Sequence, residues 1–101
     1  MEREPLFVCM TMDVERIDEY SPTGGPATWE LGARSVQSYC EALAERGMPA
    51  TLFVVPDTAL EQGDLLRDVA DETGTELGMH IHPQSWKDHY LNPEEHDYLG
   101  G

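Results

Sequence analysis

The chain has few positive charges: six Lys and Arg residues stand against 20 Asp and Glu in 101 residues, a formal net charge of −14 at pH 7. Binding the phosphate backbone of nucleic acid requires clustered Lys and Arg, so this composition argues against a nucleic-acid partner. The acidic residues are spread through the whole sequence. A solvated surface adapted to high salt explains this spread better than a basic partner does.

Cysteines and long apolar runs are also scarce. Two cysteines, Cys9 and Cys40, are too few for a disulfide framework, and we expect both to be free and buried. Residues 1–4 are acidic and the apolar run after them is short, which argues against a secretory signal. No apolar stretch approaches the roughly 20 residues of a membrane span. We therefore expect a cytoplasmic protein that does not contact a membrane.

Apolar and amphipathic segments alternate along the chain, whose length suits one small domain. Continuous apolar runs predict buried strands at residues 6–12, 50–55 and about 75–81. Two segments with helical spacing lie between them, so the predicted order is β-α-β-α-β, with parallel strands and right-handed crossovers. Three strands and two helices leave a sheet edge uncovered. We therefore expect an α/β fragment, one section of a larger barrel.

The ends of both helices have sequence signals. The first helix should follow an N-cap at Thr28 and end before a left-handed Gly47. In the second, Thr58 and Glu61 predict a capping box, and Gly74 is expected to end the helix. The predicted apolar faces are Val36, Tyr39, Cys40 and Leu43 in the first helix and Leu65, Leu66, Val69 and Ala70 in the second.

Two pairs of polar side chains follow predicted strands. Asp13 and Glu15 come after the first strand, and His80 and His82 come at the end of the third. Residues i and i+2 of a strand point to the same side, so each strand delivers two candidate ligands to one face. In parallel α/β folds, functional groups gather at the carboxyl ends of the strands. The two pairs therefore predict a single metal site, because two histidines and a carboxylate form a common open site for a divalent ion.

Three stretches resemble the polysaccharide deacetylases, the NodB-homology family of carbohydrate esterases. Residues 11–15 (TMDVE) are similar to the family's first motif, residues 47–55 (GMPATLFVV) to its second strand, and residues 76–83 (ELGMHIHP) to the opening of its second motif. The resemblance covers residues 6 to about 86. It identifies residues 1–101 as the N-terminal half of such a domain.

The resemblance implies a distorted (β/α) barrel, usually of seven strands, that hydrolyses acetyl groups on sugars with zinc or another divalent ion. By position, Asp13 would be the general base, Glu15 the acidic metal ligand and His80 the first histidine of the second motif. The family's next histidine falls at position 84, where this chain has Gln84. Strand alternation lets His82 act in its place.

The substrate implied by the resemblance is an acetylated sugar or a small amide. Trp86, close behind the histidines, is a candidate for lining its pocket, whereas His89 and His96 are expected on the surface. The family's later motifs supply an arginine, an apolar acetyl pocket and a second catalytic histidine, and they would lie beyond Gly101.

Three other functions stay open at this point. The first is a metal-independent amidase of the same superfamily, of the allantoinase-like branch. The second is a degenerate or truncated domain that binds metal, sugar or a protein without turnover, which Gln84 favours. The third is a response-regulator-like signalling domain. That domain would need a phosphoacceptor aspartate after the third strand, where His80 and His82 stand instead.

Overall fold

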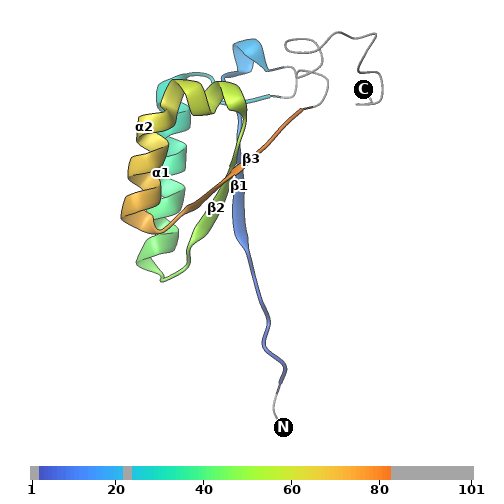
Figure 1. Ribbon diagram of the computed structural model, residues 1–101, viewed down its shortest axis with the longest axis vertical. Helices are drawn as coiled ribbons and strands as arrows, with labels where there is room; N and C mark the ends of the chain where they lie inside the picture. The colour runs from blue at the N-terminus through green and yellow to red at the C-terminus, as the bar shows by residue number, and fades with distance from the viewer. Residues whose placement is uncertain (1–2, 22–23, 83–101) are drawn as a thin grey trace.

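The computed structural model describes residues 3–21 and 24–82, which form a three-stranded parallel sheet with two helices (Figure 1). The strands, in sheet order, are β1 (Met10–Val14), β2 (Ala50–Val54) and β3 (Glu76–Met79). The other elements are the 3-10 turn η1 (Asp18–Tyr20) and the helices α1 (Trp29–Glu45) and α2 (Pro56–Thr73). The predicted β-α-β-α-β order and the parallel pairing are both confirmed.

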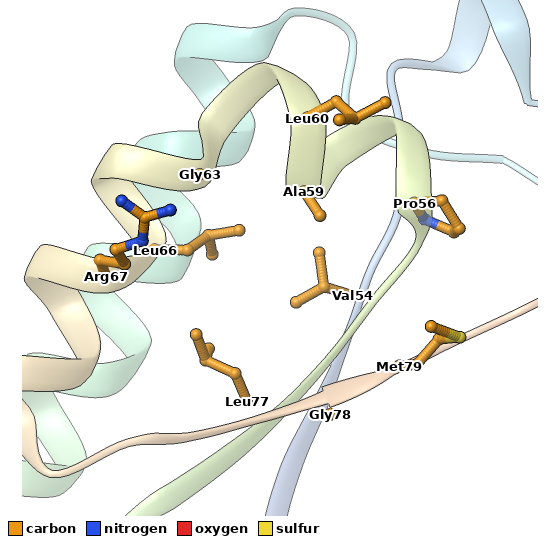
Figure 2. Close-up of a pocket in the computed structure, with 10 residues that line it drawn as sticks. All are labelled: Val54, Pro56, Ala59, Leu60, Gly63, Leu66, Arg67, Leu77, Gly78 and Met79. Atoms are coloured by element: carbon orange, nitrogen blue, oxygen red, sulfur yellow. The ribbon is translucent and has the colours of Figure 1, made fainter.

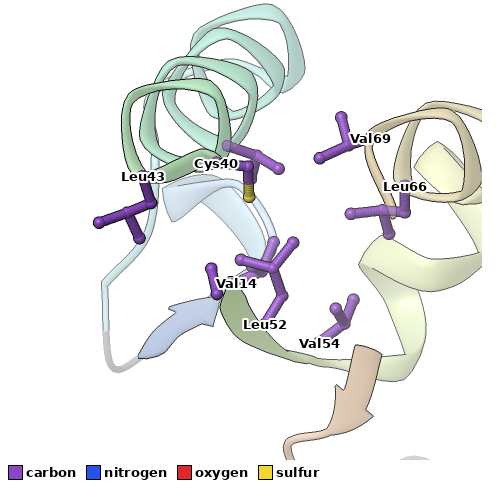
Figure 3. Packing of buried hydrophobic residues seen from close by; sticks show 9 residues of the cluster. Val14, Cys40, Leu43, Leu52, Val54, Leu66 and Val69 are labelled. Carbon is purple, nitrogen blue, oxygen red and sulfur yellow. The ribbon is translucent and has the colours of Figure 1, made fainter. Parts of the chain in front are cut away.

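Both helices lie on the same side of the sheet, and the core fills the space between them and the strands (Figures 1 and 3). Leu52 in the central strand is fully buried at its middle. The core cluster consists of Val14, Val36, Cys40, Leu43, Ala50, Leu52, Val54, Leu66 and Val69. No helix of the described residues covers the opposite side, which we call the open face. By strand alternation the open face carries Thr11, Asp13, Thr51, Phe53, Glu76 and Gly78.

The helix ends follow local chemistry. Thr28 caps α1, since its side chain accepts a hydrogen bond from the Leu31 N–H at 3.1 Å. Gly47 has the predicted left-handed conformation, with a φ of 69°. Gly74 ends α2 as predicted, and it is also left-handed, with a φ of 70°. The prediction of a capping box at Thr58 and Glu61 is wrong. The N-cap is Val55, so the helix begins three residues earlier than predicted, because Pro56 has a φ that suits the first turn, and Thr58 is buried inside the helix.

The first strand begins later than predicted. Residues 6–9 lie outside β1, and Leu6, Phe7 and Val8 are 87%, 87% and 68% exposed. The reason is register: Met10 pairs with Ala50, the first residue of β2, so no described strand lies beside the residues that precede Met10. Cys9 is free but exposed, which corrects the prediction of two buried thiols, whereas Cys40 is free and buried as expected.

Apolar grooves run along both edges of the sheet. One, of about 610 Å³, lies between α2 and the outer side of β3, where Leu66, Val54 and Leu77 surround the same space (Figure 2). The other, of about 350 Å³, lies between β1 and the start of α1, with Leu31 in its wall. Among the described helices, none is both long and apolar enough to cross a membrane.

Candidate metal centre

Glu15 and His80 lie side by side at the carboxyl end of the sheet, each just past the end of its strand. The backbone ladder continues beyond the strands as far as these residues. The Val55 N–H donates to the Val14 carbonyl at 3.1 Å, and the His80 N–H donates to the Val54 carbonyl at 3.0 Å. Two groups that are 65 residues apart in sequence therefore stand in one row across the sheet.

The side chains of Glu15, His80 and His82 converge on one point. Nε2 of His80 lies 3.0 Å from Oε1 of Glu15, and Nε2 of His82 lies 2.9 and 3.0 Å from Oε1 and Oε2. The two rings meet edge to face, with centroids 4.6 Å apart. All three side chains are partly buried, between 19% and 29% exposed. The cluster is therefore partly shielded from solvent and partly accessible to it.

This cluster could hold a metal ion. One ligand atom from each of the three residues lies within 4.8 Å of the others. A tetrahedral zinc ion with bonds of about 2.0–2.1 Å separates neighbouring ligand atoms by about 3.4 Å. The observed separations of 2.9–3.0 Å between Glu15 and the histidines would thus have to widen by only about 0.5 Å. Both Nε2 atoms would have to be unprotonated to bind the ion.

Asp13 borders the cluster without joining it. Its Oδ2 is 3.9 Å from Nε2 of His80, and its side chain is 63% exposed on the open face. In the sheet Asp13 stands two rows before Glu15, beside Phe53 and Gly78. The carboxylate is therefore close enough to act on a molecule bound at the cluster, and it remains accessible.

The structure brings the four predicted residues together at one end of the sheet: Asp13, Glu15, His80 and His82. Trp86, Gln84, His89 and His96 lie outside the described residues. One contact near the cluster that the sequence did not reveal is the 2.7 Å ion pair between Asp57 and Arg16, the residue that follows Glu15. They are 41 positions apart, so no local pattern links them.

Phe53 was also missed. Its ring lies against Gly78, since a Cβ at position 78 would stand 3.0 Å from Cδ1 of the ring. The pair forms the open face next to Asp13, two rows before His80. A signal was present in the sequence, because Phe53 alternates with the buried Leu52 and Val54 and so had to face the other side.

Comparison of the chain with protein-family models, with curated proteins and with solved structures finds no match in any of the three. The resemblance to polysaccharide deacetylases therefore stays a prediction, and the site is interpreted from its own geometry.

Proposed function

We propose that this chain is part of a metal-dependent hydrolase of non-peptide C–N bonds, which removes acetyl groups from a carbohydrate or a related small amide. The observation that carries the proposal is the convergence of Glu15, His80 and His82, with Asp13 3.9 Å from His80. Two imidazoles and one carboxylate leave a coordination position for water, and a further acid beside such a group can accept a proton.

In this proposal, three residues bind the metal and a fourth accepts a proton. Glu15, His80 and His82 hold a divalent ion, zinc in this proposal. When bound, zinc supplies a water whose pKa is near 7 and polarises the acetyl carbonyl. Asp13 takes the proton of the attacking water on its exposed carboxylate. A group that protonates the leaving amine is not found among the described residues, and the proposal assigns it to a part of the barrel outside them.

The barrel is part of the same proposal. Strands in sequential order, with both helices on one side, are the arrangement of a (β/α) barrel, whose interior corresponds to the open face here. The apolar grooves along β1 and β3 are the positions that neighbouring barrel elements would cover. Barrel active sites lie at the carboxyl ends of the strands, where Glu15 and His80 stand. These features support a barrel, and its seven strands are what the resemblance to the deacetylases implies.

A second candidate is a domain that binds without turnover. The contacts between Glu15 and the two histidines have hydrogen-bond lengths, so these polar groups are satisfied without an ion. A degenerate site would keep this arrangement for structural reasons alone.

The test combines metal analysis with an activity assay on the full protein purified from its own source. We expect one divalent ion per chain and release of acetate from N-acetylglucosamine oligomers, abolished by chelation and restored by zinc. Glu15→Ala and His80→Ala should lose the ion. Asp13→Asn should keep it and lose about 10²- to 10⁴-fold in rate, the usual contribution of a general base.

The alternatives give different results. Amide hydrolysis that survives thorough chelation would indicate a metal-independent amidase. A bound ion without turnover of acetylated sugars would indicate a binding domain. Full metal content in both Glu15→Ala and His80→Ala would remove these residues from the site.

A further inference from the structure

The two halves of the candidate metal centre are both attached to the junction between β2 and α2, residues 54–57. Val54 accepts the backbone hydrogen bond of His80, and Val55 donates to Val14, the neighbour of Glu15. Asp57, the second residue of α2, bonds to Arg16, the other neighbour of Glu15. This junction therefore fixes the position of Glu15 relative to His80, and the Arg16–Asp57 contact is the link that involves side chains.

The Arg16–Asp57 pair is well placed to hold the backbone beside Glu15. Nη1 of Arg16 donates to Oδ2 of Asp57 at 2.7 Å, and the Arg16 side chain is only 11% exposed. Asp57 lies in the first turn of α2, where the helix dipole favours a negative charge. The Arg16 backbone also packs closely on Gly25, where a Cβ would collide with the Arg16 carbonyl.

We propose that Arg16 and Asp57 are positioning residues that set the metal affinity of the centre by fixing the carboxylate of Glu15 against His80 and His82. The inference rests on the proposed metal site. Loss of either partner frees the backbone next to Glu15, so ordering this ligand then opposes binding. Removal of groups that orient metal ligands typically lowers metal affinity about 10- to 100-fold. Because this pair acts one residue away from the ligand, we expect the lower end, about 10-fold.

An electrostatic effect and a positioning effect predict opposite changes in metal affinity when Arg16 is replaced. If only charge mattered, loss of the Arg16 cation would strengthen the binding of a divalent ion, and loss of the Asp57 anion would weaken it. If position matters, both losses weaken binding to a similar extent. Removing both residues should then be little worse than removing one, because they act as a unit.

The experiment is a Co²⁺ titration of the full protein, with affinity from calorimetry and ligand geometry from the visible absorption of bound cobalt. The variants are Arg16→Gln, Asp57→Asn and the double variant. Arg67→Gln is the matched control, because it removes the same charge from a 79% exposed arginine whose nearest acidic group, on Asp64, is 3.9 Å away. We expect about 10-fold weaker binding in both single variants and in the double variant, an altered cobalt spectrum, and wild-type behaviour in Arg67→Gln.

Conservative variants distinguish loss of the ion pair from loss of folding. Arg16→Lys and Asp57→Glu keep the charges, so they should bind cobalt more tightly than Arg16→Gln and Asp57→Asn, respectively. Unchanged or tighter binding in Arg16→Gln would overturn the positioning role and leave the metal site standing. A wild-type protein that binds no cobalt would overturn the metal site, and the inference with it.

Discussion

Metal binding should stabilise the fold strongly, because the ligands come from both ends of the described chain. Glu15 and His80 are 65 positions apart, so the unfolded chain does not present them together. An ion that binds only the folded state at a free concentration of 100 times its Kd adds about 2.7 kcal/mol to the free energy of unfolding. For a domain of this size, each kcal/mol raises Tm by about 4–8 °C, which gives an increase of about 10–20 °C.

Removing one ligand should remove this increase. Glu15 contacts both histidines, so Glu15→Ala takes away the group around which the cluster is arranged. The control is Glu19→Ala, which removes the same charge from an exposed acid in η1, four residues further along. Thermal unfolding followed by circular dichroism, with zinc or with chelator, measures the shift in each variant.

Two results would refute the reasoning. A wild-type Tm that does not respond to zinc would mean that the cluster holds no ion at this concentration. An equal shift in Glu15→Ala and in Glu19→Ala would mean that zinc binds somewhere else in the chain.

Three further predictions concern stability and are checked by urea unfolding. Leu52→Ala should lower the free energy of unfolding by about 2–5 kcal/mol, because Leu52 is fully buried at the centre of the core, and a smaller loss would show that the core relaxes around the gap. Thr58→Val should raise it by about 1 kcal/mol, since the buried Thr58 hydroxyl has no hydrogen-bond partner among the described residues, and a decrease would reveal a partner. Raising NaCl from 0.1 to 1 M should raise the urea concentration at the unfolding midpoint, because the Debye length falls from about 10 to about 3 Å. The shorter length weakens the repulsion between charges in a chain of net charge −14. A lower midpoint would contradict this.

Much of the fold could be predicted because the signals are local. The order of elements follows from apolar runs and helical spacing, and Thr28, Gly47 and Gly74 mark helix ends through their own side chains or backbone freedom. Strand alternation predicts that Asp13 faces the same side as Glu15, and His80 the same side as His82. These features depend on residues a few positions apart, which a sequence shows directly.

The failures concern partners that are distant in sequence. An apolar run at residues 6–9 has the composition of a strand, but β2 begins at Ala50 in register with Met10, so the run has no described neighbour to pair with. The start of α2 was misplaced because the local signal of Thr58 and Glu61 competed with Pro56, and the proline prevailed.

The sequence by itself determined which groups this protein carries to the end of each strand, because alternation and chain order are properties of the sequence. Tertiary structure alone decided that Glu15 touches both histidines, that Asp13 stays 3.9 Å from His80 in solvent, and that Arg16 bonds to Asp57. Those contacts depend on the register of three strands and the docking of α2, which arise from burial of the core as a whole.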